Sequence, residues 1–137
     1  MKRRVLFLCT GNSCRSQLAE AMVGHDLGDK WEASSAGTRP AGFVHPLVPV
    51  VLAEIGIRHQ GRSKSIEEFR RAEFDLVVTV CDSAAEECPV WLGKGKRLHI
   101  AFPDPAQSKG SEAEQLGVFR ALRDDIRRRV VAALQTL

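Results

Sequence analysis

Short continuous apolar runs alternate along this chain with segments in which apolar residues recur every three or four positions. Residues 5–9 are all apolar, which is typical of a strand buried on both faces of a parallel sheet. Residues 15–26 follow, with Leu18, Ala21 and Met22 at helical spacing. The pattern therefore predicts a strand that leads through a short turn into a helix.

The rest of the chain continues this alternation. Further strands are predicted at residues 31–37, 75–81 and 97–102, and helices at 47–55, 65–71 and 111–137. The helix at 47–55 is expected to begin near Pro46 and to end at Gly56. Ser65, with Glu68 three residues later, predicts a capping box. Strands that alternate with helices predict a single α/β domain over residues 1–137, with a parallel sheet and right-handed crossovers.

Three chemically reactive side chains fall where the predicted strands end. Cys9, Cys81 and Asp104 all lie at or just past such an end. In an open parallel α/β sheet, the ligand site lies beyond the carboxyl ends of the strands, at a topological switch point. We therefore expect these three residues to share one site.

The five residues between Cys9 and Arg15 form a loop suited to an anion. In a strand–turn–helix of this length, backbone N–H groups point inward beside the positive end of the helix dipole. Arg15 can grip a tetrahedral oxyanion with two donors, and Ser16 can donate a hydrogen bond to a Cys9 thiolate, which the same field favours. The expected oxyanion-binding residues are Thr10, Gly11, Asn12, Ser13, Cys14 and Arg15.

This loop has two other interpretations. Cys9 alone is also compatible with a buried strand cysteine that has no chemical role. A nucleotide-binding P-loop is not expected, because the pattern GxxxxGK[ST] is absent.

Composition describes an ordinary globular protein of 137 residues, 44% hydrophobic and 27% charged, with a net charge of +3. The first apolar stretch is shorter than a signal-peptide core, and no run approaches the ~18 apolar residues of a membrane span. We expect a cytoplasmic protein with neither a membrane nor a nucleic-acid partner, because the basic segment "RALRDDIRRR" lacks interleaved aromatic residues. In a reducing compartment, four cysteines favour redox, nucleophilic or metal-binding chemistry over a fixed disulfide framework.

The segment "CTGNSCRSQLAEA", followed far downstream by "DPA", resembles the low-molecular-weight tyrosine phosphatase superfamily and, within it, the thioredoxin-coupled arsenate reductases. The resemblance covers essentially the whole chain in element order. It implies a four-stranded parallel sheet flanked by helices, with Cys9 as nucleophile, Arg15 as oxyanion clamp and Asp104 as general acid. An acid at Asp104 would protonate a leaving oxygen, although Asp-Pro is also an ordinary turn pair. No metal ion and no cofactor is expected.

The stretch "VTVCDSAAEECPV" distinguishes a reductase from a phosphatase. A phosphatase needs only water to release phosphate from its cysteine, whereas a reductase needs thiols to deliver two electrons to arsenic. The resemblance implies that Cys9 forms an adduct with arsenate, Cys81 attacks Cys9 and releases arsenite, and Cys88 then attacks Cys81. Thioredoxin would reduce the resulting Cys81–Cys88 disulfide. Arsenate is the expected substrate, phosphate and sulfate are its mimics, and the chain is expected to be a monomer.

Alternatives to this relay stay open. Zinc is disfavoured, because CX4C and CX6C spacings do not match the CX2C pairs of structural sites. In place of a relay, Cys81 and Cys88 could be two unrelated buried cysteines, or incidental thiols of a tyrosine phosphatase. The non-enzymatic alternative is an oxyanion sensor. The tyrosine pair that follows Asp-Pro in many such phosphatases is absent. Cys14 either packs beneath the loop, which we favour, or forms a protective disulfide with Cys9. Glutaredoxin or a small thiol is the alternative reductant.

Some relatives in this superfamily hold a potassium ion beside the loop. The resemblance matches its polar ligands to Asn12, Glu20 and Ser35, and its remaining carboxylate to a position near Lys64. A lysine there would replace the cation, because its ammonium group can pair with Glu20 directly.

Overall fold

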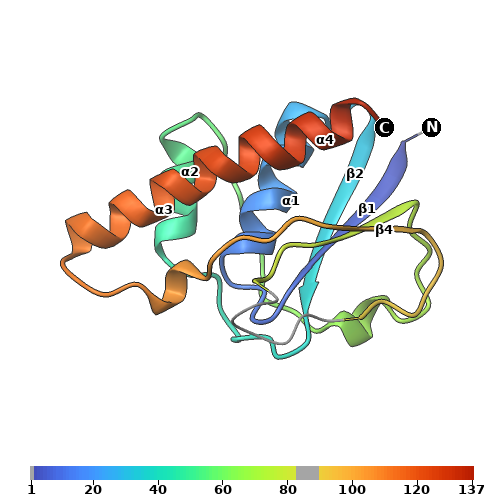
Figure 1. The fold of residues 1–137 in the computed structure, drawn as a ribbon, viewed down its shortest axis with the longest axis horizontal. Coiled ribbons are helices and arrows are strands. Elements are labelled where there is room, and N and C mark those ends of the chain that lie inside the picture. The colour runs from blue at the N-terminus through green and yellow to red at the C-terminus, as the bar shows by residue number, and fades with distance from the viewer. Residues whose placement is uncertain (1, 83–89) are drawn as a thin grey trace.

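The computed structural model describes residues 2–82 and 90–137 of the chain (Figure 1). Its strands are β1 (Arg3–Cys9), β2 (Trp31–Gly37), β3 (Leu76–Thr79) and β4 (Lys96–His99). They form one sheet in the order β2-β1-β3-β4, and every neighbouring pair is parallel. The predicted four-stranded parallel sheet is therefore confirmed.

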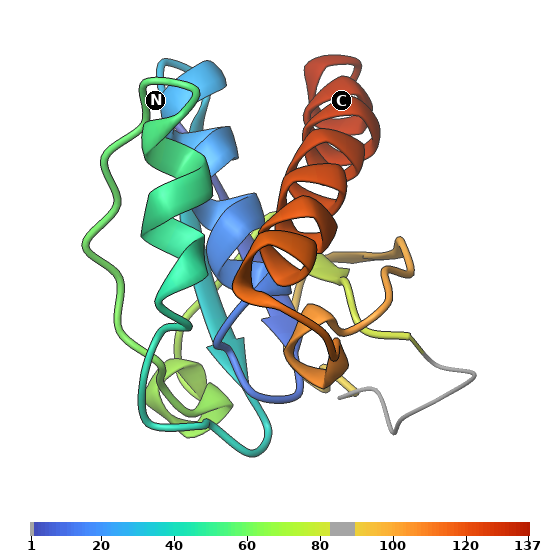
Figure 2. The same ribbon diagram turned by 90° about the vertical axis from the view of Figure 1, so that its left-hand side faces the viewer.

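Helices cover one face of this sheet. They are α1 (Arg15–Asp26), α2 (Leu47–Ala53), α3 (Glu112–Ile126) and α4 (Ala132–Gln135), with a π-helical turn at Arg127–Val131. Two short 3-10 turns, η1 (Ile66–Phe69) and η2 (Pro105–Gln107), lie in the connections. Helix α3, the π turn and α4 run on as one long rod, which lies beside α1 and α2 in Figure 2. No helix in the described part of the chain is long and apolar enough to cross a bilayer.

The apolar run of β1 is buried on both sides, as its sequence predicts. Val5 and Phe7 belong to the larger core cluster, which packs the helices against the sheet. Leu6 and Leu8 belong to a second cluster on the opposite face, with Trp91. Alternate residues of a strand point to opposite faces, so a wholly apolar strand is needed where both faces are covered.

Several element boundaries differ from the predicted ones. β1 begins at Arg3, because its pairing with β2 already starts there. Helix α2 ends at Ala53, before the turn that Gly56 makes at a positive φ of 76°. The strand predicted at 75–81 is shorter and corresponds to β3, Leu76–Thr79. The strand predicted at 97–102 corresponds to β4, which ends at His99 because its partner β3 ends opposite it.

The capping box predicted at Ser65 is wrong. The Ser65 side chain does cap a turn, accepting from the Glu67 N–H at 3.1 Å, but this turn is the 3-10 element η1. The Glu68 carboxylate binds Arg62 at 2.8 Å instead of returning to the Ser65 backbone. The complete capping box lies instead at the start of the closing helix, between Ser111 and Glu114, where none was predicted.

The strand order creates a switch point at β1. The chain passes from β1 through α1 to β2 on one side, and then crosses to β3 on the other side of β1. The carboxyl ends of β1 and β3 therefore lie together, at the edge of the sheet where an α/β fold places its ligands.

Candidate active site

The loop between β1 and α1 is held by its backbone carbonyl groups. Those of Thr10, Gly11 and Ser13 accept hydrogen bonds at 2.9–3.1 Å from N–H groups in the segment 39–45. In a trans peptide the N–H points opposite to the C=O, and no described peptide bond is cis. The following N–H groups therefore point away from that segment, and the N–H of Asn12 lies 3.2 Å from the Cys9 Sγ. This backbone geometry is the one that an anion nest needs, and anion binding by the loop stays a prediction.

Asn12 supplies the backbone turn that opens the nest. Its φ is 49°, and it is the only non-glycine residue with a positive φ within residues 2–82 and 90–137. Asparagine tolerates this left-handed conformation better than most residues. Its side chain is fully buried behind the loop, where it takes part in hydrogen bonds that fix the turn.

Cys9 ends β1 as a free, buried thiol. Its sulfur lies 2.8 Å from the Ser16 hydroxyl oxygen. That oxygen already accepts a hydrogen bond from the Asn12 Nδ2 at 2.7 Å, so the hydroxyl proton is left to point at the sulfur. The Cys9 sulfur therefore has a hydrogen-bond donor aimed at it from the start of α1.

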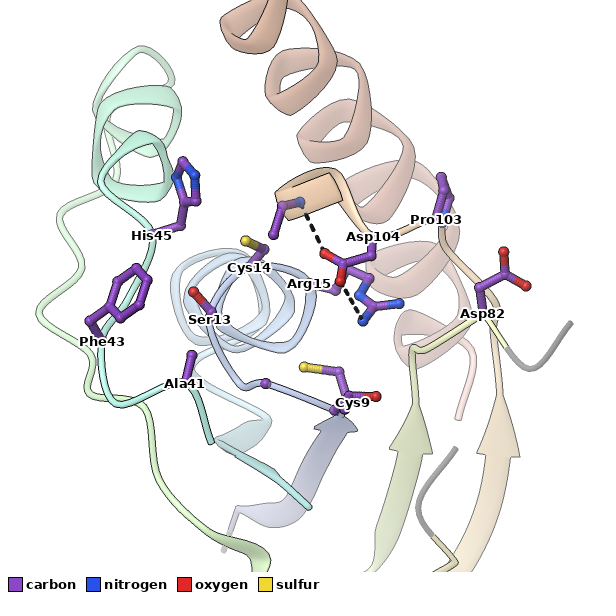
Figure 3. A pocket seen from close by; sticks show the side chains of 13 residues that line it. Cys9, Ser13, Cys14, Arg15, Ala41, Phe43, His45, Asp82, Pro103 and Asp104 are labelled. Atoms are coloured by element: carbon purple, nitrogen blue, oxygen red, sulfur yellow. Dashed lines mark hydrogen bonds and ion pairs between the residues drawn. The ribbon is translucent and has the colours of Figure 1, made fainter. Parts of the chain in front are cut away.

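Arg15 and Asp104 lie next to each other beside the loop (Figure 3). The Arg15 Nη2 is 3.8 Å from the Asp104 Oδ2, and its Nη1 donates to the Phe102 carbonyl at 3.2 Å. Asp104 Oδ1 accepts from the Ala106 N–H at 3.0 Å and so caps η2. The Asp-Pro pair therefore forms an ordinary turn through Oδ1. Its other oxygen, Oδ2, stays on the Arg15 side of the carboxyl group.

A cavity of about 760 Å³ opens over these groups. Of the predicted site residues, the structure places Cys9, Thr10, Gly11, Ser13, Cys14, Arg15 and Asp104 in its wall, whereas Asn12 and Ser16 lie behind the loop. Figure 3 shows Phe43 and His45 on one side of the cavity and Asp82 on the other. None of these three residues was predicted from the sequence. Only Asp82 carried a signal, as the residue that follows Cys81 past a strand end.

Cys14 lines the cavity but is only 3% exposed. Burial raises the pKa of its thiol to about 12, against the opposing effect of a hydrogen bond from Ser13. A thiol that stays protonated is a poor nucleophile. This favours the packing role over a part in the chemistry.

Cys81 follows β3 at the sheet edge that carries Cys9. The Val80 N–H donates to the Leu8 carbonyl at 2.8 Å, so the residues that follow lie at neighbouring strand ends. Cys81 is fully buried and disulfide-bonded, whereas Cys9 and Cys14 are free thiols. Cys88 lies outside the described residues, so its predicted role stays a prediction.

Lys64 lies beside Glu20, as predicted from the sequence. Its Nζ is 3.9 Å from the Glu20 Oε1 and 3.5 Å from the Ser35 Oγ, and Ser35 in turn donates to Glu20 at 3.0 Å. Burial lowers the pKa of Lys64, and the Glu20 carboxylate opposes that shift. The ammonium group thus stands among the polar groups that the resemblance assigns to a cation.

The basic face of the closing helix is internally neutralised. Arg120 and Arg123 bind Glu54 at 2.6 and 2.8 Å, and Arg127 binds Asp26 at 2.7 Å. Arginines committed to carboxylates of the same chain leave little charge for a phosphate backbone. No group of three or more histidine, cysteine or acidic residues among those described is arranged to hold a metal ion.

Comparison with known proteins identifies the family. The model of the low molecular weight phosphotyrosine protein phosphatases matches residues 4–137. The chain belongs to this family. It is 41% identical over 136 residues to an arsenate reductase of Halalkalibacterium halodurans, covering 98% of this chain and 97% of that one.

Solved structures of arsenate reductases have the same fold. An arsenate reductase in the phosphate-binding state superposes with a TM-score of 0.76 at 28% identity, covering 99% of this chain and 98% of that one. A thioredoxin-dependent arsenate reductase of Corynebacterium glutamicum gives a TM-score of 0.68 at 28% identity, covering 99% of this chain and 64% of the other.

Proposed function

We propose that this member of the phosphatase family reduces arsenate to arsenite with thiols and is recycled by thioredoxin. The observation that carries the proposal is the second buried cysteine, Cys81, at the strand end beside Cys9. The full-length similarity to a protein named arsenate reductase supports it, as does the thioredoxin-dependent structural neighbour.

In the first step, the Cys9 thiolate attacks arsenic and displaces one of its oxygens. The backbone N–H groups of the loop and the guanidinium of Arg15 hold the remaining oxygens. The Asp104 carboxyl group lies beside Arg15 and would give its proton to the leaving oxygen, which departs as water. Phosphate and sulfate would occupy the same nest as mimics.

The electrons come from sulfur in the second step. The Cys81 thiolate attacks the Cys9 sulfur, and the electron pair of the sulfur–arsenic bond passes to arsenic, which leaves as arsenite. Cys88 would then displace Cys9 from Cys81, and the dithiol of thioredoxin would reduce the Cys81–Cys88 disulfide by exchange.

The decisive experiment is the cysteine series, assayed by arsenate-dependent NADPH consumption with thioredoxin and its reductase. Cys81→Ser should lose arsenate reduction but still hydrolyse an activated aryl phosphate, since water can release phosphate from Cys9. Cys9→Ser should lose both activities, because an alcohol is not ionised at neutral pH. A wild-type chain that hydrolyses the aryl phosphate without reducing arsenate would instead be a phosphatase.

The third thiol is tested by a single turnover. Cys88→Ser should release at most one arsenite per chain and stop with Cys9 joined to Cys81, which peptide mapping would detect. Sustained turnover by this variant would rule out the three-thiol relay. Binding of arsenate without any thiol oxidation in the wild type would identify an oxyanion sensor.

We also propose that residues 1–137 act as one catalytic domain, as a monomer and in the cytoplasm. The relay needs a compartment in which thiols are kept reduced. Light scattering during turnover would test the monomer.

A further inference from the structure

Gln17 is a fully buried polar side chain on the side of the loop away from the cavity. Its Nε2 donates to the carbonyl and to the side-chain oxygen of Asn12, at 3.1 and 3.0 Å, and to the Arg62 carbonyl at 2.9 Å. Its Oε1 lies 2.7 Å from the His59 Nε2. Since all the partners of Nε2 are oxygens, the amide has one orientation, with its oxygen toward the histidine.

The neighbouring glycine is an independent sign that this contact is built into the fold. A Cβ atom at Gly61 would collide with both the Gln17 Oε1 and the His59 Nε2. The φ of Gly61 is outside the left-handed range, so its backbone conformation does not require glycine. Glycine is needed at this position because a side chain there would occupy the space of the Gln17–His59 contact.

We propose that Gln17 is a positioning residue that directs the Ser16 hydroxyl proton toward the Cys9 sulfur. Gln17 Nε2 and the backbone N–H of Lys64 both donate to the Asn12 Oδ1, each at 3.0 Å. These two donors hold the oxygen of the Asn12 amide away from Ser16 and turn its Nδ2 toward the Ser16 oxygen, 2.7 Å away. The hydroxyl, occupied as an acceptor, then donates to sulfur. The proposal deepens the proposed function, since every chemistry considered for Cys9 begins with its thiolate.

His59 fixes the far end of Gln17. Burial lowers the pKa of His59, against the opposing effect of Glu20, whose Oε2 lies 3.7 Å away; Lys64 lowers it further. A neutral imidazole can still donate from Nε2, and the carbonyl oxygen of Gln17 is the acceptor within 2.7 Å. The hydrogen bond between His59 and Gln17 therefore fixes the Gln17 amide behind the loop.

The test is the pH profile of Cys9 alkylation by iodoacetamide in the reduced protein, with fragment-ion mass spectrometry to assign the label. Gln17→Met keeps the size of the side chain and removes its hydrogen bonds. We expect the midpoint of the profile to move up by about one pH unit, the effect of losing one hydrogen bond to the thiolate. Gln115→Met is the matched control, because its amide bonds only the Gly110 carbonyl, away from the loop, and it should leave the midpoint in place.

A double-variant comparison separates positioning from general support of the fold. Ser16→Ala should also raise the midpoint, and adding Gln17→Met to it should raise it no further, because the hydroxyl through which Gln17 acts is gone. An unchanged midpoint in Gln17→Met, or the same shift with and without Ser16, would overturn the proposal.

Gly61→Ala provides a second route if Gln17→Met does not fold. The new methyl group meets only the far ends of two side chains, so the fold is kept while the Gln17 amide is displaced. The midpoint should again rise, and an unchanged profile would overturn the proposal. The assay contains neither arsenate nor thioredoxin. An unchanged alkylation profile would therefore not contradict the three-thiol relay. A protein that fails to reduce arsenate would not contradict the role of Gln17.

Discussion

Replacing Arg15 with lysine keeps the charge but removes the planar pair of donors. The guanidinium is 2% exposed and is held between the Phe102 carbonyl, at 3.2 Å, and the Asp104 carboxylate, at 3.8 Å. A lysine ammonium carries its donors on a single nitrogen, so it cannot contact that carbonyl and also grip an oxyanion with two parallel bonds.

The size of the effect follows from the bonds that are lost. One charge-assisted hydrogen bond to the oxyanion contributes about 1.5–3 kcal/mol, which corresponds to roughly a 10- to 150-fold loss in kcat/KM for arsenate. Phe102 is buried, so its carbonyl oxygen loses a buried donor if the lysine turns to the oxyanion, which costs about 1–3 kcal/mol of folding free energy. Both losses should therefore be measurable in Arg15→Lys.

Two assays separate these losses. Coupled NADPH oxidation at varied arsenate concentration gives kcat/KM, and urea unfolding followed by circular dichroism gives the fraction folded. Arg58→Lys, at an exposed position in the connection after α2, is the matched control and should change neither quantity. A fully folded Arg15→Lys variant with wild-type kcat/KM would refute the role given to this arginine.

Three further predictions concern other charged side chains. Asp104→Asn keeps an oxygen for the Ala106 N–H, so phosphate inhibition should persist while kcat for arsenate falls about 100-fold or more; equal loss of binding and turnover would make Asp104 structural. Because Lys64 stands against Glu20, exchanging sodium for potassium at constant ionic strength should leave turnover unchanged, and a rise would contradict the lysine's role. Hydrogen bonds from Arg127 lower the pKa of Asp26, so its charge stabilises the fold above the ordinary pKa of a carboxyl group and this stabilisation is lost as the pH falls through the lowered value. The stability deficit of Asp26→Asn in urea should accordingly shrink below about pH 4, and a deficit that is the same at every pH would contradict the ion pair.

The N-terminal half of the fold was predictable because its signals are local. Residues 5–9 of β1 are an unbroken apolar run, and the bounds of α1 and β2 match the predicted residues. The end of β4 was not predictable in this way. The apolar residues Ile100 and Phe102 extend its pattern, but Phe102 leaves the sheet to join the core under the helices.

The candidate site divides in the same manner. Spacing and residue type sufficed to predict that the loop from Cys9 to Arg15 and Asp104 lie at one cavity, since strand ends converge at one edge of a parallel sheet. Gln17 and His59 gave no signal, because the contact between them depends on how the connection after α2 folds back over α1. Only the three-dimensional structure brings such distant segments together.

β4 also determines where the sheet ends. It is an edge strand of four residues, and the side chains of Lys96, Arg97 and His99 are exposed along it. A free edge can add a strand from another molecule, and short, positively charged edges resist this. If the β4 strands of two copies paired, their lysine and arginine side chains would repel each other. A strand of four residues would form few backbone hydrogen bonds to offset that repulsion. At the β4 edge, strand length and charge therefore disfavour extension of the sheet by a second molecule.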